Sequence, residues 1–268
     1  MSTPTFVSAE SFAAGQQVTL GEDAAHHMRV RRLDVGTRVA LLDGRGTRGE
    51  GVIVRLVRRN ATVAVEAAQS EPQPRAVHLL LPIADKDRML WLAEKAAELG
   101  AASWRPVQFR RSKSVASRGE GTMFTQKVAA RMISAIEQSG SAWLPAIFPD
   151  ATVDRAIAAA PEGIRVVLDG AGAPLARMAI SPSPVHATNG AGAGPSSDAT
   201  GAGAGPDPML APPVVMVIGP EGGIEPDELE HLTEAGFTRA SIGSTILRFE
   251  TAAVAALGIV QSLIAGER

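Results

Sequence analysis

The chain of 268 residues contains no cysteine, has a formal net charge of only −2 and has no long apolar run. Without cysteine there can be no disulfide bond, thiolate metal site or cysteine nucleophile. The uncharged, mostly apolar stretch near the C-terminal end, residues 251–266, has 16 residues, fewer than the ~20 that span a bilayer. The first residues show neither the basic nor the apolar region of a secretory signal. These absences predict a cytoplasmic protein that does not bind membranes.

Hydrophobic residues make up 45% of the chain, enough for a substantial core, and the length favours two domains over one. The overall charge gives no reason to expect a nucleic acid partner, but the N-terminal part is richer in basic residues than the rest of the chain. Nine arginines and no lysine lie between residues 29 and 59, against three acidic residues. Planar guanidinium groups suit bidentate contacts to phosphate, so this segment favours RNA contact over the alternative of a solvated rim.

Residues 1–72 have the pattern of a small β-domain. Apolar residues recur in RVALLDGRG, GEGVIVRLV and ATVAVEAA, and turn residues lie at Asp43-Gly44 and Asn60-Ala61. This spacing is typical of a small barrel or sandwich. Glu71–Pro74 follows with two prolines, which cannot continue a helix or a central strand, so we expect a linker there.

Residues 76–268 alternate between two kinds of segment. Apolar runs suited to buried strands, such as HLLLPIA and VVMVIGP, are followed by segments of helical period, such as KDRMLWLAEKAAELG. This alternation predicts an α/β domain with a mainly parallel sheet. Residues 186–206 interrupt the order, because they hold six glycines and six alanines but no Leu, Ile, Val, Phe or Met. We expect a flexible surface insertion there.

Two glycine turns follow apolar runs in the C-terminal part. The first, GPEGG at 219–223, lacks the lysine of a phosphate-binding P-loop and the spacing of a dinucleotide fingerprint, and its glutamate would repel a pyrophosphate but tolerate a cation. The second lies in IGSTILRFETA at 242–252. Either turn alone is explained by tight packing. Together they predict neighbouring loops at the carboxyl edge of the parallel sheet, where such sheets bind ligands.

The two turns together resemble the paired signature of the SPOUT RNA methyltransferases, and in particular of RsmE-type enzymes. The resemblance continues in AHHMRVRRLDVGTRVALLDGRG at 25–46, in KDRMLWLAEKAAELG, in RRS at 110–112 and in IEQSGSAWLPAI at 136–147. It therefore covers nearly the whole chain. It implies methylation by S-adenosylmethionine of N3 of a uridine in 16S ribosomal RNA of the small ribosomal subunit, at uracil 1498 in that family.

The resemblance also implies an architecture and a cofactor site. The C-terminal part, 76–268, would be a trefoil-knotted SPOUT-type α/β domain with a mainly parallel sheet, and residues 1–72 a PUA-like β-barrel that binds RNA. The enzyme would be a homodimer. S-adenosylmethionine would lie in the knot, against Leu168, Asp169, Gly170, Ile218, Gly219, Pro220, Glu221, Gly222, Gly223, Ile242, Gly243, Ser244, Ile246 and Leu247.

Methylation at N3 requires alignment of the acceptor and stabilisation of the uracil anion. Arg248, directly after the second turn, is our candidate for that stabilisation, and the alternative is a salt bridge from Arg248 to Glu250 or Glu221. Glu221 and Glu250 are also the candidates for a general base, although capping of a helix explains either of them equally well.

The resemblance implies that a set of basic residues contacts RNA phosphates: Arg29, Arg31, Arg32, Arg110, Arg111 and Lys113. We expect no metal site at His26-His27, since adjacent side chains of a strand point to opposite faces and no third ligand is evident. Trp91 is expected in the core. Trp104 and Trp143 are each either core or base-stacking residues, with core favoured.

Two other functions remain open from the sequence. The protein could be an RNA-binding ribosome-assembly factor that keeps the fold and the cofactor but does not catalyse. It could also be a SPOUT methyltransferase that acts on tRNA or on a ribose 2′-hydroxyl.

Overall fold

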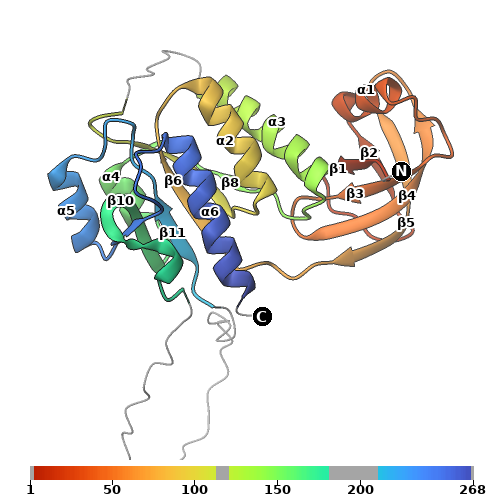
Figure 1. Ribbon diagram of the computed structural model, residues 1–268. Coiled ribbons are helices and arrows are strands. Elements are labelled where there is room, and N and C mark those ends of the chain that lie inside the picture. Colours follow the sequence, from red (N-terminus) through yellow and green to blue (C-terminus); the bar gives the residue numbers. More distant parts are fainter. Residues whose placement is uncertain (1–2, 113–120, 181–210, 267–268) are drawn as a thin grey trace, which may run out of the picture.

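The computed structural model describes residues 3–112, 121–180 and 211–266, so the insertion predicted at 186–206 lies outside the described residues. The chain forms one sheet of five strands and one of seven. In Figure 1 the five-stranded sheet and α1 lie on one side of α2 and α3, and the larger sheet with α4, α5 and α6 lies on the other. Among the described helices, none is both long enough and apolar enough to cross a membrane.

The N-terminal sheet is curled and has the strand order β1-β3-β4-β5-β2. Its elements are β1 Thr5–Val7, β2 Gln17–Leu20, α1 Glu22–Val30, β3 Arg38–Leu42, β4 Thr47–Leu56 and β5 Ala61–Ser70. Apart from β1, which pairs in parallel with β3, the neighbouring strands are antiparallel. The three strands predicted from the sequence are therefore confirmed as β3, β4 and β5. Asp43 forms the predicted turn, since its side chain accepts hydrogen bonds from the N–H groups of Arg45 and Thr47, both at 2.8 Å.

The expectation that His26 and His27 belong to a strand is wrong, because both lie on helix α1. The helix begins after Gly21, and Glu22 and Asp23 occupy its first turn, where acidic groups interact favourably with the helix dipole. Its apolar face is short, with only Ala25 and Met28 buried, so the helical period is weak in the sequence.

The larger sheet has the order β12-β10-β11-β6-β7-β8, and all of its neighbouring pairs are parallel. Its elements are β6 Val77–Pro82, α2 Lys86–Glu98, β7 Ser103–Gln108, α3 Gly121–Ser139, β8 Ala146–Ile147, β9 Ala151–Thr152, α4 Val153–Ala158, β10 Ile164–Pro174, the 3-10 helix η1 Leu175–Arg177, β11 Val214–Val217, α5 Pro226–Glu234, β12 Thr238–Ser241 and α6 Phe249–Ala265. The predicted parallel α/β architecture is thus confirmed. The sequence analysis missed β8, β9, α4 and η1, which are all short.

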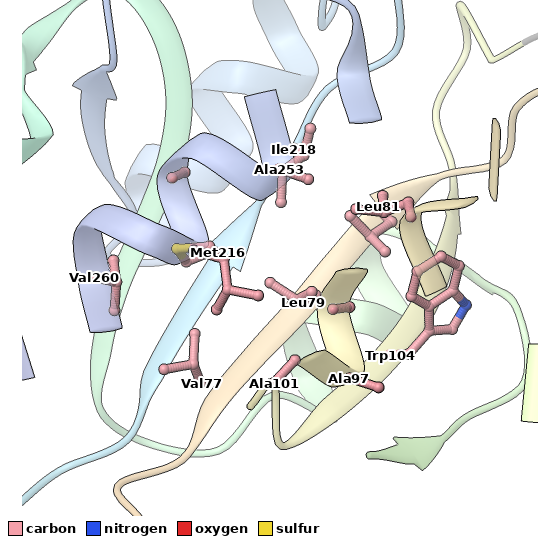
Figure 2. Packing of buried hydrophobic residues seen from close by; sticks show 14 of the residues in the cluster. Val77, Leu79, Leu81, Ala97, Ala101, Trp104, Met216, Ile218, Ala253 and Val260 are labelled. Atoms are coloured by element: carbon pink, nitrogen blue, oxygen red, sulfur yellow. The ribbon is translucent and has the colours of Figure 1, made fainter. Parts of the chain in front are cut away.

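Helices cover both faces of this sheet. Successive residues of a strand point to opposite faces, so Leu79 packs with α2, α3 and α6, whereas Leu80 packs with α4 and α5. Figure 2 shows the first of these layers, in which Leu79 and Met216 meet side chains of α2 and α6, including Ala97 and Val260. Burial on both faces explains why these strands have continuous apolar runs.

The three tryptophans have different environments. Trp104 on β7 is 1% exposed and belongs to the core, as favoured from the sequence. Trp91 on α2 is 46% exposed, so its expected place in the core is wrong. The buried face of α2 is formed by Met89, Leu92 and the alanines that follow, and Trp91 falls outside that stripe. Trp143 is half-buried at the junction between the two sheets.

The turn between β3 and β4 forms this junction with the segment after α3. The Gly46 N–H donates to the Ala142 carbonyl, and the Leu144 N–H donates to the Gly44 carbonyl, both at 2.9 Å. Gly46 has a φ of 101°, and a Cβ atom there would lie 2.4 Å from the Trp143 ring. Glycine at this position is therefore required both by the backbone conformation and by the packed indole.

Gly46→Ala should destabilise the protein more than Gly36→Ala. Gly36 also has a positive φ, of 92°, but no atom lies within 4 Å of a Cβ placed there. We expect Gly36→Ala to lower the free energy of unfolding by ~1–2 kcal/mol through backbone strain, and Gly46→Ala by a further ~1–3 kcal/mol through overpacking. Urea unfolding of both variants measures the difference, and equal losses would contradict the packing role of Trp143.

A half-buried carboxylate at the same junction should make stability depend on pH. Glu137 on α3 accepts a hydrogen bond from the Val7 N–H at 3.1 Å. Burial raises the pKa of its carboxyl group, although the hydrogen bond and the charges of His27 and Arg31 oppose that shift. The folded protein thus binds this proton more tightly than the unfolded chain, so the contribution of Glu137 falls as pH rises through the raised pKa.

Glu137→Gln should remove this dependence, because the amide oxygen can still accept from Val7 but carries no charge. In urea unfolding at a series of pH values, we expect the variant to gain stability relative to the wild type as pH rises from acid towards neutral. Parallel curves for the two proteins would show that the carboxyl group is not the cause.

Candidate ligand site at the carboxyl edge of the parallel sheet

Three segments that are far apart in the chain meet at the carboxyl edge of β10, β11 and β12. Residues 168–170 follow the part of β10 that pairs with β11, the GPEGG turn follows β11, and residues 242–247 follow β12. Since the strands are parallel, their carboxyl ends lie on the same edge of the sheet. The parallel register therefore brings the three segments together.

The segment at β10 leaves the sheet in a bulge. The pairing of β10 with β12 shifts register between Leu168 and Ala173. Gly172 allows the backbones to approach closely, because a Cβ there would lie 2.5 Å from the Ala240 N–H nitrogen. Asp169 lies within this bulge and accepts from the Ala171 N–H at 2.8 Å and pairs with Arg239 at 3.0 Å. Burial alone would raise the pKa of Asp169, but the hydrogen bond from Ala171 and the Arg239 guanidinium outweigh it and lower the pKa.

The GPEGG turn is closed by its own backbone. The Gly223 N–H donates to the Pro220 carbonyl at 2.8 Å, and Gly223 has a φ of 78°. A Cβ at Gly219 would lie 2.6 Å from the Ile224 side chain, so the turn can fold over Ile224 only with glycine there. The turn then leads into α5 through Pro226, as the sequence predicted.

A pocket of about 270 Å³ lies between the three segments. It is lined by all the residues predicted to hold the cofactor except Glu221 and Gly222. Ile224, Ala240, Phe249 and Ala252 also line it and were not singled out from the sequence, although Phe249 and Ala252 lie within the second motif and Ile224 directly follows the first. The lining is mostly apolar, with backbone groups at the glycine turns and one carboxylate, Asp169.

Glu221 and Gly222 lie on the other side of the turn, in a second pocket of about 190 Å³. This pocket shares Pro220 and Phe249 with the first, so the two pockets are neighbours. Arg88 lies in its wall and pairs with Glu221, and the Arg88 Nε lies 3.8 Å from a Glu250 carboxylate oxygen. The cation that joins these two acids is therefore Arg88 of α2.

The alternative salt bridge from Arg248 to Glu221 or Glu250 does not occur in the described part of the chain. Arg248 is exposed, and its guanidinium has no ion pair or side-chain hydrogen bond with any described residue. Glu250, by contrast, is 8% exposed in the first turn of α6. One of its carboxylate oxygens is buried with no hydrogen-bond partner among the described residues.

The residues predicted to bind RNA fall into two groups. Arg29, Arg31 and Arg32 lie on or just after α1, where Arg29 donates to the Val57 and Arg58 carbonyls at 3.2 and 2.7 Å. Arg110 and Arg111 follow β7 and pair with acidic residues at the start of α5. Any phosphate at this second group would have to compete with those carboxylates. Lys113 lies outside the described residues.

The comparisons with known proteins agree with this arrangement. Residues 71–261 match the family described as RNA methyltransferase domain, and residues 20–66 match the family described as RNA methyltransferase PUA domain. The chain therefore belongs to the RNA methyltransferase family, which confirms the class that the two glycine motifs predicted. The trefoil knot stays a prediction, because strand order and strand pairing do not describe the path of the chain.

Individual relatives extend over most of the chain. The ribosomal RNA small subunit methyltransferase E of Mycobacterium bovis is 27% identical over 241 residues, which are 90% of this chain and 84% of that protein. The crystal structure of a protein of the same name from Neisseria gonorrhoeae, bound to S-adenosyl methionine, has a TM-score of 0.79 at 24% identity over 98% of both chains. A methyltransferase from Legionella pneumophila in complex with the same cofactor has a TM-score of 0.81 at 23% identity, also over 98% of both chains.

Arg111→Ala should loosen the GPEGG turn. The Arg111 guanidinium donates to the Gly222 carbonyl at 2.8 Å and makes two hydrogen bonds to Glu225, at 2.7 and 3.0 Å. We expect faster amide hydrogen exchange at 220–225 in this variant, by about 5–10-fold, because exposed charged hydrogen bonds contribute about 1 kcal/mol. Arg110→Ala is the matched control, since the Arg110 side chain pairs with α5 and not with the turn. Equal acceleration in both variants would contradict the bracing role of Arg111.

Proposed function

We propose that the protein transfers a methyl group from S-adenosylmethionine to N3 of a uridine in 16S ribosomal RNA, as RsmE-type enzymes do. The position implied by the resemblance, uracil 1498, is part of this proposal. The observation that carries it is the single pocket between residues 168–170, the GPEGG turn and residues 242–247. The family resemblance implied that these segments form one cofactor site. In the fold they line one pocket, although they are far apart in the chain.

The chemistry of the pocket fits S-adenosylmethionine, which supplies an electrophilic methyl group when bound. Leu168, Ile218 and Leu247 provide an apolar enclosure for the adenine ring, and the glycine turns let backbone groups approach the ligand closely. Asp169 is held in its charged form by Arg239 and the Ala171 N–H. A carboxylate at this place favours a ligand that carries positive charge.

Two tasks remain for the side chains of the protein in this reaction. A carboxylate must take the proton from N3, and a cation must balance the charge that then spreads over the uracil oxygens. Glu221 lines the neighbouring pocket, whereas the carboxylate of Glu250 is buried behind Arg88, which favours Glu221 as the base. Arg248 remains our candidate for charge stabilisation.

The position of Arg248 supports a homodimer. Arg248 is exposed and lines neither of the two pockets among the described residues of one chain. Beside it, Ile246 is 99% exposed. On α6, Val254, Ile259 and Leu263 are only partly buried. A partner subunit that covered these apolar side chains would place Arg248 of one chain near the site of the other.

The other parts of the chain would bring the RNA to this site. We propose that residues 1–72 act as a PUA-like RNA-binding domain, with Arg29, Arg31 and Arg32 as phosphate contacts, and that residues 76–268 form the methyltransferase domain. Arg31 and Arg32 are exposed after α1, which supports this role. A substrate in the small ribosomal subunit would place the protein in the cytoplasm.

The reaction can be tested with purified protein, methyl-labelled S-adenosylmethionine and 30S subunits that lack the modification. We expect 3-methyluridine, identified by mass spectrometry of the digested RNA and mapped to one position in the 16S chain. Binding of the cofactor and of 30S subunits without methylation would instead favour an assembly factor. Methylation of another atom, or of tRNA only, would show a different SPOUT specificity.

A side chain in place of Gly243 should block the cofactor. Gly243 lines the pocket, does not have a positive φ, and has no atom within 4 Å of a Cβ placed there. Gly243→Leu should therefore fold normally but weaken S-adenosylmethionine binding about 10–100-fold, since it fills the space of the ligand. Gly21→Leu, at a glycine of the N-terminal unit with equally open surroundings, is the control. Calorimetric titration that gave equal affinities for both variants would contradict this position of the cofactor.

A further inference from the structure

The second pocket is a direct neighbour of the proposed cofactor pocket. It borders the proposed cofactor pocket through Pro220 and Phe249, which belong to the walls of both. It also shares Ile83 and Ala84 with a larger apolar pocket of about 630 Å³ between α2, α3 and β7. The three pockets thus form a continuous row along the carboxyl edge of the sheet, and the second pocket is in the middle.

The walls of the second pocket combine apolar side chains with charged groups. Ile83, Ala84, Pro220 and Phe249 form the apolar part, and the polar part consists of Asp85, Arg88, Arg111 and Glu221. Uracil has a matching character, because its ring is flat and its edge presents two carbonyl acceptors on either side of the N3–H donor. Unstacked bases are bound in proteins through this edge, with stacking against apolar or aromatic side chains.

Of the two guanidinium groups in the pocket, Arg88 is the one with a terminal nitrogen that makes no hydrogen bond to the described residues. All three nitrogens of Arg111 already donate to Glu225 or to the Gly222 carbonyl. Arg88 uses Nη1 for Glu221, and its Nε lies 3.8 Å from Glu250. Its second terminal nitrogen, Nη2, makes no hydrogen bond within the described part of the chain.

Glu250 lies next to Arg88 but outside the pocket. The carboxylate is 8% exposed, does not line the pocket, and faces the Arg88 Nε. A buried charge is tolerated only when an opposite charge lies near it. Glu250 therefore acts through Arg88 as a positioning residue, and Glu221 is the carboxylate that can reach a bound base.

We propose that this pocket binds the uracil of the target nucleotide and that Arg88, as a second cation beside Arg248, stabilises its anion, an inference that rests on the proposed function. The N3–H bond breaks, and its proton passes to a carboxylate oxygen of Glu221. Glu221 becomes neutral and releases Arg88, whose charge then balances the negative charge on uracil O2 and O4. The N3 lone pair forms the new bond to the methyl carbon as the carbon–sulfur bond breaks, and that electron pair stays on sulfur as a thioether.

The test uses Arg88→Ala and Arg88→Lys with unmodified 30S subunits as substrate. Arg131→Ala is the matched control. Like Arg88, this arginine pairs with a glutamate, since its Nη1 lies 3.8 Å from a carboxylate oxygen of Glu94, but it is exposed and lines none of the three pockets. We expect kcat to fall about 10²–10³-fold in Arg88→Ala, the loss typical of one removed anion-stabilising donor. We expect a smaller loss in Arg88→Lys, and unchanged S-adenosylmethionine affinity in all three variants.

The pH profile separates stabilisation of the anion from bracing of the turn. Without Arg88 the bound uracil is harder to deprotonate, so the rate of Arg88→Ala should continue to rise with pH where the wild-type rate has levelled off. Wild-type kcat in Arg88→Ala, or a loss of cofactor affinity in proportion to the loss of rate, would overturn the inference. If the wild type itself forms no 3-methyluridine, the proposed function has failed first, and the two failures are thereby distinguished.

Discussion

The parallel pairing of β11 with β6 and β10 is the constraint on which the proposed site depends. Val214 pairs with both Val77 and Ile164, so the three strands are in register over the length of β11. Their side chains are buried on both faces by helices, which excludes a shift of register without exposure of apolar surface. The core therefore places residues 168–170 and the GPEGG turn at one edge of the sheet, and their own hydrogen bonds fix their local conformation.

Charge is distributed asymmetrically around the GPEGG turn. On the side of the second pocket, Arg88 and Arg111 fix the turn through Glu221, Gly222 and Glu225. On the side of the first pocket, the lining is mostly apolar with one carboxylate. Such an arrangement is expected of a site in which a positively charged methyl donor binds on one side of a loop and an acceptor that becomes an anion binds on the other side.

The sequence predicted much of this fold because its strands and helices have strong local patterns. The doubly buried strands are continuous apolar runs, and α2 and α5 carry their stop and start signals at Gly100 and Pro226. Short elements such as α1 lack a sufficient apolar stripe, and Trp91 shows that a large apolar residue on a helix is not always on its buried face.

The pairing of charged side chains could not be predicted in the same way. Arg88 and Glu221 are separated by 133 residues, and only the sheet topology brings them together. The sequence therefore identified Glu221 and Glu250 as candidates but assigned Arg248, which directly follows the second glycine turn, as their alternative partner. Likewise, the acids of α5 that pair with Arg110 and Arg111 are far from them in sequence.

The claim that three separate segments form one cofactor site is tested most directly by amide hydrogen exchange with and without S-adenosylmethionine. The account predicts that exchange slows together at residues 168–170, 218–223 and 242–247, over the same range of cofactor concentration. Slower exchange at one of these segments alone, or at a surface away from all three, would contradict it.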